Sequence, residues 1–164
     1  MEEKDFVIRG VAHDEKVVKI AILGIPNNPG IAHQIFSTLA DAHIVVDMIV
    51  QSIRNIEKNI TDMVFTIAAD DLAKARPIVD RVANDLNAIA VLVEDDVAKV
   101  SIVGVGMLGN PGIAARMFGA LAAADINIDV ISTSEISISC LVKVAAIKKA
   151  VNAIHKEFFP EKSE

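Results

Sequence analysis

Residues 29–52, PGIAHQIFSTLADAHIVVDMIVQS, and residues 111–134, PGIAARMFGALAAADINIDVISTS, are two copies of one pattern. Aligned end to end, they are identical at 12 of 24 positions. A matching apolar run precedes each copy, KIAILGI at residues 19–25 and KVSIVGV at residues 99–105. The unit recurs after roughly 80 residues, which is too long for a solenoid repeat and suits a duplicated small domain.

Within the first copy, the hydrophobic period changes from strand-like alternation to helical spacing and back. Asn28, Pro29 and Gly30 predict a helix start, with Asn28 as the N-cap and Pro29 at the first helical position, where its missing N–H costs nothing. Pro77 falls inside the second predicted helix and should remove a hydrogen bond or kink it. The predicted elements are a strand at 17–25, a helix from 29, strands at 44–53 and 61–68, a helix at 71–83 and a strand at 88–93.

The second copy predicts the same order of elements but ends one strand short. An unassigned strand at residues 6–11 precedes the first copy much as residues 89–94 precede the second. We predict that this N-terminal strand completes the second sheet, so that removing the first 12 residues damages the C-terminal half. The other predicted elements of this copy are strands at 100–106, 126–132 and 136–144, a helix at 111–124 and a helix from 147.

This pattern predicts an α+β protein of two ferredoxin-like βαββαβ units, each with an antiparallel four-stranded sheet and two helices on one face. The expected domains are residues 15–95 and 96–160, the latter with strand 6–12 added. Strands such as residues 20–23 and 45–50 have little polar alternation, so the other sheet face needs a cover. Sheet-to-sheet or edge-to-edge association would supply it, and we therefore expect a homodimer.

The composition limits the functional classes. The 164 residues are 52% apolar and 23% charged, as in folded domains rather than disordered chains. A net charge of −6 without a basic block argues against a nucleic-acid surface. Prolines, glycines and polar residues interrupt the longest uncharged span, residues 20–40, which argues against a membrane helix. The acidic residues 1–5 do not resemble a signal peptide, and we expect a cytoplasmic protein.

The reactive residues form no recognisable catalytic set. The single cysteine, Cys140, cannot form an internal disulfide and lies in a strand-like run, which predicts a buried sheet thiol. The four histidines are scattered without the spacing of a metal site. Neither a Ser/His/Asp or Cys/His set nor a Lys-bearing phosphate loop is recognisable. The sequence therefore predicts no catalytic site, no metal and no cofactor in this chain.

The string Asn-Pro-Gly-Ile at the start of each first helix is the candidate site. The amides of Gly30, Ile31, Gly112 and Ile113 are expected to point outward at the positive end of the helix dipole, which suits a carboxylate or phosphate. Polar residues of the following strands could accept from an ammonium and complete a site for a zwitterion. They are Asp47, Gln51 and Ser52 in one copy, and Asn127, Asp129, Ser132, Thr133, Ser134 and Glu135 in the other. Ordinary capped helices and solvent-facing strand residues are the simpler alternative.

A second motif, GVGMLG at residues 104–109, has the G-x-G-x-x-G spacing between a predicted strand and helix. Asp129 lies 20 residues beyond it, as in dinucleotide-binding folds. The next predicted strand, however, leads into a hairpin rather than a second crossover helix. The first copy also lacks the glycine spacing. We therefore expect no NAD site.

The strings that carry a family likeness are KIAILGI (19–25), PGIA (29–32), DMIVQ (47–51), KVSIVGVGM (99–107), NPG (110–112) and NIDVISTSEI (127–136). They resemble the tandem ACT domains of aspartate kinase, over nearly the whole chain. The resemblance implies the regulatory region, or beta subunit, of aspartokinase, the first enzyme of the pathway from aspartate to lysine, threonine and methionine. It also implies that the kinase domain is not part of this chain.

In this family, end-product amino acids bind where the first ACT unit of one chain meets the second unit of its dimer partner, and they favour an inhibited assembly. Carried over by position, a threonine-like effector would sit on Asn27, Asn28, Gly30, Ile31, Ala32, Gln51, Asn127 and Ile128. By pseudo-symmetry, a second effector pocket would involve Asn110, Gly112, Ile113, Ser132, Thr133, Ser134 and Glu135. The family often has an acidic residue at the position of Asn27, which would help to hold a cationic lysine; the asparagine departs from that pattern.

The resemblance thus implies feedback inhibition of aspartokinase by threonine, lysine or both. The implied partners are the free amino acid, a second copy of the chain, and the aspartokinase catalytic domain or alpha subunit. Two alternatives from other classes remain. One is an ACT regulatory subunit, or a free-standing amino-acid sensor, for another metabolic enzyme. The other is the nucleotide-binding enzyme that the glycine string would indicate.

Overall fold

The computed structural model describes residues 7–107 and 110–161. The chain divides into two compact units. One unit is Lys16–Asp96, and the other joins Met1–Glu15 to Val97–Glu164. Each unit carries one copy of the repeat, so the duplication in the sequence corresponds to two compact units.

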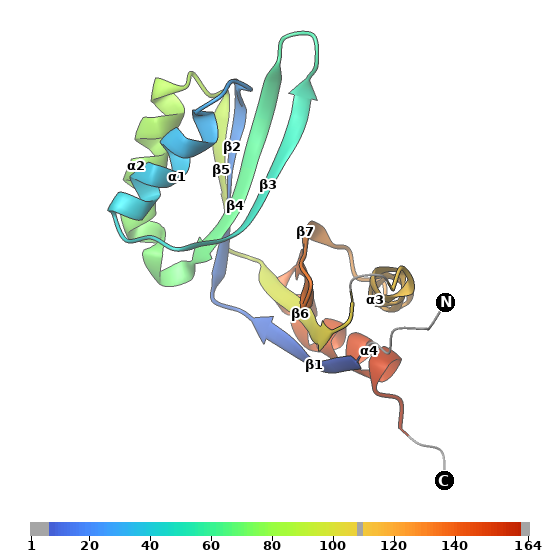
Figure 1. Ribbon diagram of the computed structural model, residues 1–164. Coiled ribbons are helices and arrows are strands. Elements are labelled where there is room, and N and C mark those ends of the chain that lie inside the picture. Colours follow the sequence, from blue (N-terminus) through green and yellow to red (C-terminus); the bar gives the residue numbers. More distant parts are fainter. Residues whose placement is uncertain (1–6, 108–109, 162–164) are drawn as a thin grey trace. The chain divides into compact units, whose positions relative to one another are not determined.

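The Lys16–Asp96 unit has an antiparallel sheet in the order β3-β4-β2-β5, with the two helices side by side on one face (Figure 1). This is the predicted βαββαβ order. Its elements are β2 (Val17–Pro26), α1 (Ile31–Asp41), β3 (Val46–Asn55), β4 (Ile60–Ala68), the 3-10 turn η1 (Ala69–Asp71), α2 (Leu72–Asp85) and β5 (Ala90–Glu94).

Apolar residues at alternate positions of the central strands form the core of this unit. Ile20 and Ile22 of β2 and Phe65 of β4 point toward the helices and are fully buried. They meet Ile35 and Leu39, which lie one helical turn apart on α1 and so share a face. Pro77 lies inside α2, as predicted, and the helix continues through it to Asp85.

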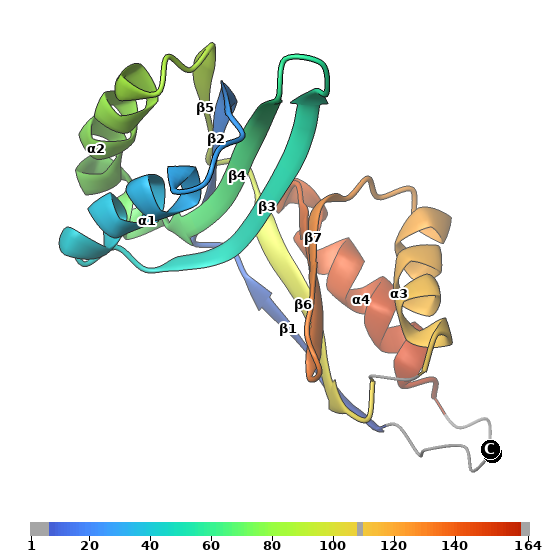
Figure 2. The same ribbon diagram turned by 45° about the horizontal axis from the view of Figure 1, so that its top comes forward.

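The other unit repeats the arrangement in the order β1-β6-β8-β7, with α3 and α4 side by side against its sheet (Figure 2). Met117 and Leu121 of α3 and Ile154 of α4 are buried against Val100 and Ile102 of β6. Its elements are β1 (Val7–Asp14), β6 (Ala98–Val105), α3 (Gly112–Ala123), β7 (Asp129–Thr133), β8 (Ser137–Val142), the 3-10 turn η2 (Val144–Ala146) and α4 (Ile147–Phe158).

The N-terminal strand completes this second sheet, which confirms the prediction from the missing strand. β1 pairs antiparallel with β6, from Val7 opposite Val105 to Asp14 opposite Lys99. Ile8 of β1 is 9% exposed and belongs to the core of the unit. A Cβ at Gly104 would overlap the main-chain oxygen of Val7, so a residue without a side chain is needed there for β1 to approach β6.

The predicted start of the first helix is wrong in its details. Gly30, not Asn28, is the N-cap of α1, and it has a φ of 93° in the left-handed region, where glycine is favoured. In the second copy Pro111 is the N-cap of α3, and the Asn110 Oδ1 accepts a hydrogen bond from the Gly112 N–H at 3.3 Å. The two helix starts therefore differ, although the sequence is the same over Asn-Pro-Gly-Ile.

Cys140 is buried in β8, as the sequence predicts. Burial disfavours the thiolate and raises the pKa of this thiol to about 12. The thiol therefore stays protonated at neutral pH and has little nucleophilic character. In the described part of the chain, none of the helices has the length and apolarity needed to cross a bilayer.

Candidate functional site

The loop between β2 and α1 carries the first candidate site. Gly30 turns the chain into the helix, and the Gln34 N–H donates to the Gly30 oxygen at 2.9 Å. The Ile31 N–H, expected to be free, donates to the Asn28 oxygen at 3.3 Å. A ligand at this helix start would therefore replace one long, weak turn bond. Asn27, Asn28, Gly30 and Ala32 are exposed here.

A cluster of three amide side chains holds this loop. The Gln51 Nε2 on β3 donates to the Asn27 Oδ1 at 3.1 Å. Asn59, at the end of the β3–β4 hairpin, contacts Asn27 through both its main chain and its side chain. The structure thus brings together Asn27 and Gln51, two residues that the sequence analysis placed in one site. The sequence did not predict Asn59 as a site residue, because asparagine is common in turns for purely local reasons.

An ion pair beside the loop fixes the end of β2. Asp62 on β4 accepts hydrogen bonds from the Gly24 N–H at 2.8 Å and from the Arg54 Nε at 2.7 Å, and its side chain is 14% exposed. Gly24 lies where the β2–β4 register shifts, and it has a φ of 69°. Partial burial raises the pKa of Asp62, but the two hydrogen bonds and the charge of Arg54 outweigh that effect and hold the pKa below its ordinary value.

The lowered pKa of Asp62 predicts a pH-dependent contribution to stability. The contribution is present above the unfolded pKa, near 4, and is lost as the pH falls through the folded pKa. We expect Asp62→Asn to lower the free energy of unfolding by about 1–2 kcal/mol at pH 7 and by much less at pH 3. Solvent screens the ion pair with the exposed Arg54, so that pair contributes only a small part of the loss. Urea unfolding at both pH values measures this.

Asp80 offers a matched control, because its pair with Arg76 lies on an exposed helix face, with Nε to Oδ2 at 3.0 Å. Asp80→Asn should cost only about 0.3–0.5 kcal/mol at pH 7. An equal loss of stability in Asp62→Asn at pH 7 and pH 3 would contradict the assignment.

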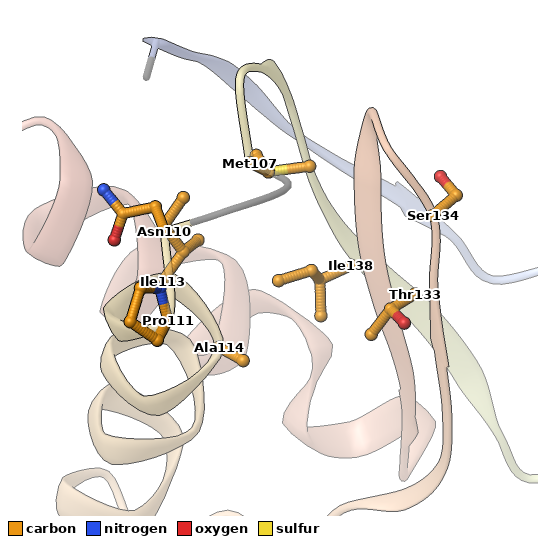
Figure 3. A pocket seen from close by; sticks show the side chains of 8 residues that line it. All are labelled: Met107, Asn110, Pro111, Ile113, Ala114, Thr133, Ser134 and Ile138. Atoms are coloured by element: carbon orange, nitrogen blue, oxygen red, sulfur yellow. The ribbon is translucent and has the colours of Figure 1, made fainter. Parts of the chain in front are cut away.

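The start of the second copy's first helix opens onto a cavity of about 320 Å³ (Figure 3). Met107, Ile113 and Ile138 form apolar walls, and all three are buried. Asn110 and Thr133 are polar lining residues on opposite sides, and the Asn110 carboxamide points away from Thr133 in this view. None of the described lining residues is charged, so the cavity suits a small neutral or zwitterionic molecule. The lining residues are Met107, Asn110, Pro111, Ile113, Ala114, Thr133, Ser134 and Ile138.

Four residues of the predicted second pocket line this cavity: Asn110, Ile113, Thr133 and Ser134. Gly112, Ser132 and Glu135 are not among the lining residues. The apolar walls were missed, because buried Met107 and Ile138 have the sequence signature of core residues. Ser134 also closes the β7–β8 turn, since its Oγ accepts from the Ser137 N–H at 3.2 Å.

Asn127 and Ile128, predicted for the first site, belong to the other unit and lie just before β7. Asn127 is exposed and Ile128 is half-buried. β7 bulges between Asp129 and Ile131, and Val130 there has a φ of 42°. Left-handed backbone is costly for a β-branched residue, so the segment after Asn127 is strained.

A sequence model described as the ACT domain matches residues 20–81 and 100–158. The chain belongs to the ACT-domain family. Each of the two matched segments lies in one of the two structural units, so the chain is a tandem pair of ACT units. The antiparallel pairing of β7 with β8 excludes the parallel dinucleotide-binding fold at this position. Of the glycine string, Leu108 and Gly109 lie outside the described residues, and Gly104 is explained by the approach of β1.

Several relatives of these ACT units are aspartokinases. The aspartokinase of Mycolicibacterium smegmatis is 41% identical over 155 residues, which are 94% of this chain and 37% of that protein. The regulatory subunit of aspartate kinase from Thermus thermophilus has a TM-score of 0.86 at 36% identity, with 92% of this chain and 98% of that chain covered. A structure of aspartokinase alpha and beta subunits gives a TM-score of 0.84 at 38% identity, covering 93% and 99%.

The chain spans little more than a third of the length of the curated aspartokinases that it matches, but almost the whole of the Thermus regulatory subunit. It therefore corresponds to the regulatory ACT part of aspartokinase, and the kinase domain lies outside the matched region. ACT units in this position are consistent with allosteric regulation.

Proposed function

We propose that the chain senses free amino acids and gives feedback inhibition of aspartokinase by threonine, lysine or both, through binding at an interface between ACT units of two chains. The observation that carries the proposal is the polar loop at the start of α1. Asn27 and Gln51 converge there beside the exposed N-terminus of the helix. That arrangement suits a carboxylate on the helix amides and a polar side chain on the amide cluster.

The uncharged nature of the cluster favours threonine over lysine at this first site. Asn27, Gln51 and Asn59 offer donors and acceptors to a hydroxyl but no negative charge to an ammonium at the end of a long side chain. Asn28, Gly30, Ile31 and Ala32 complete the site from the same chain. Asn127 and Ile128 complete it from the partner in this proposal.

We propose the cavity at the start of α3 as the second effector pocket. Asn110, Gly112, Ile113, Ser132, Thr133, Ser134 and Glu135 are the residues assigned to it. The buried apolar walls of that cavity would take up the methyl group or methylene chain of an effector, and the Thr133 hydroxyl would bond its polar end.

The exposed face of the first sheet supports association of two chains. Leu92, Ala21, Val64 and Val50 lie in register across four strands, on the face opposite the helices. Leu92 is 49% exposed. An apolar row of this kind on one sheet face is typical of an interaction surface. A homodimer, acting in the cytoplasm on an aspartokinase catalytic domain or alpha subunit, is the proposed assembly.

The free energy for the proposed mechanism comes from the thermodynamic linkage between effector binding and assembly of two chains. A ligand that bridges two chains binds only the assembled form and stabilises it by RT ln(1 + [L]/Kd), about 2.7 kcal/mol at a hundredfold excess over Kd. A kinase with two activity states shifts toward the inhibited state by as much as the effector's affinities for the two states differ. The chain itself then needs neither a catalytic group nor a cofactor.

Calorimetric titration of the chain with L-threonine, with L-lysine and with both together tests the proposal. We expect saturable binding of threonine and an altered threonine affinity when lysine is present. Absence of saturable heat with either amino acid would count against an effector-binding role. Copurification with a kinase polypeptide distinguishes an aspartokinase regulator from a regulator of another enzyme.

Asn27→Asp should shift the first site toward lysine. A carboxylate in place of the carboxamide attracts the lysine ammonium, so we expect the ratio of lysine to threonine affinity to rise about 3- to 30-fold and to fall again as salt is added. Asn84→Asp on α2 is the control, because it adds the same charge at an exposed position of the same unit. The same shift in both variants would show that net charge, not the site, is responsible.

A further inference from the structure

Asn59 is the residue near the first site that neither the repeat nor the family likeness assigns. It is the last residue of the turn between β3 and β4, at residues 56–59, and has a φ of 52°. Asparagine tolerates this left-handed conformation better than most residues other than glycine. The turn brings it beside Asn27, which is 32 residues earlier in the chain.

Three hydrogen bonds join these two asparagines. The Asn27 N–H donates to the Asn59 main-chain oxygen at 3.0 Å. The Asn59 Nδ2 donates to the Asn27 main-chain oxygen at 2.9 Å. The Asn27 Nδ2 donates to the Asn59 Oδ1 at 3.3 Å. Both the main chain and the side chain of Asn27 are therefore held by one residue.

Gln51 holds the remaining polar atom of the Asn27 side chain, since its Nε2 donates to the Asn27 Oδ1 at 3.1 Å. A carboxamide has two N–H donors and two acceptor lone pairs. The bonds from Asn59 and Gln51 use one donor and one acceptor of the Asn27 carboxamide. One N–H and one lone pair are left for a ligand, in directions that Asn59 and Gln51 determine.

We propose that Asn59 is a positioning residue of the first effector site, acting through Asn27 to orient its carboxamide toward a hydroxyl-bearing amino acid. The assignment rests on the proposed function of that site. Both amides lie at the protein surface, where an unrestrained asparagine side chain samples several rotamers. A side chain that is already oriented loses less entropy when the ligand binds, so Asn59 raises affinity without touching the ligand.

A double-mutant cycle separates this role from a purely structural one. Asn59→Gly removes the side-chain bonds but tolerates the positive φ, so the main-chain bond to Asn27 can persist. We expect Asn59→Gly to weaken L-threonine binding about 3- to 10-fold by calorimetry, the effect of about one net hydrogen bond. In the N27A background, the same substitution should change affinity less than about twofold.

Glu57→Ala is the control, because Glu57 is exposed in the same turn, and it should leave the threonine affinity unchanged. Equal threonine affinity in Asn59→Gly and the parent, or an equal loss with and without Asn27, would overturn the assignment. If Asn59→Gly does not fold, Asn59→Asp is the second variant. It keeps an oxygen for the Asn27 Nδ2 and loses only the donor to the Asn27 main-chain oxygen, so the assignment predicts a threonine affinity close to that of the parent, and a loss as large as that of N27A would overturn it.

Threonine binding by the parent chain distinguishes failure of the proposed function from failure of the role given to Asn59. A parent that binds neither L-threonine nor L-lysine overturns the proposed function, and the assignment of Asn59 falls with it. A parent that binds threonine while the cycle shows no coupling between Asn27 and Asn59 overturns the assignment alone.

Discussion

A chain that lacks its first 12 residues is expected to lose the cooperative folding of the Val97–Glu164 unit while Lys16–Asp96 stays folded. The deletion removes most of β1, which forms one edge of the β1-β6-β8-β7 sheet. It takes Ile8 out of the core and leaves β6 as an unpaired edge. Loss of a buried isoleucine costs about 1.5–3 kcal/mol, and each lost ladder bond about 1 kcal/mol more. The sum approaches the roughly 5 kcal/mol that stabilises a small domain.

Amide hydrogen exchange read by mass spectrometry measures this for each unit separately. Peptides from β6 and β8 should lose protection, and peptides from β2 and β4 should keep it. Removal of residues 1–5 alone is the control that separates the loss of β1 from the loss of the residues before it. Gly104→Val tests the same pairing without shortening the chain, because its side chain would overlap the main-chain oxygen of Val7. Unchanged protection of β6 in both variants would refute the role given to β1.

Asn127→Ala is expected to weaken threonine binding about 10- to 100-fold without unfolding the chain. Asn127 is exposed in its own unit, so its loss leaves the core intact. In the proposed site its carboxamide contacts a charged end of the effector, and a hydrogen bond to a charged group contributes about 1.5–3 kcal/mol. Calorimetry gives the affinity, and the melting temperature without ligand reports the fold.

Asn152→Ala is a suitable comparison, since Asn152 is an exposed asparagine of the same unit on α4. Threonine should raise the melting temperature of this variant as much as that of the parent. Equal shifts by threonine in Asn127→Ala and the parent would remove Asn127 from the site.

The architecture was predictable because it depends on periodicity and on the repeat. Ile20 and Ile22 face the core because strand side chains alternate, and Ile35 and Leu39 share a helix face because they are four residues apart. The missing strand of the second copy identified β1 as its completion. These features follow from local patterns that do not depend on atomic detail.

The details of the site were less predictable, because they depend on tertiary contacts. The repeated Asn-Pro-Gly-Ile string has two conformations. In the first copy Gly30 is in the left-handed region, and in the second copy the Asn110 side chain accepts a hydrogen bond from the Gly112 N–H. The bond of Asn59 to Asn27 requires the hairpin to fold back onto the loop. The strained φ of Val130 depends on the bulge of β7 against β8. Sequence periodicity contains none of this information.

Sedimentation velocity of the chain with and without L-threonine tests whether an amino acid bridges two chains, because it measures assembly and effector binding together. We expect a dimer whose dissociation on dilution is suppressed by millimolar threonine, since the effector bridges two chains. A monomer at all concentrations, or a dimer whose dissociation is the same with and without threonine and lysine, would contradict it.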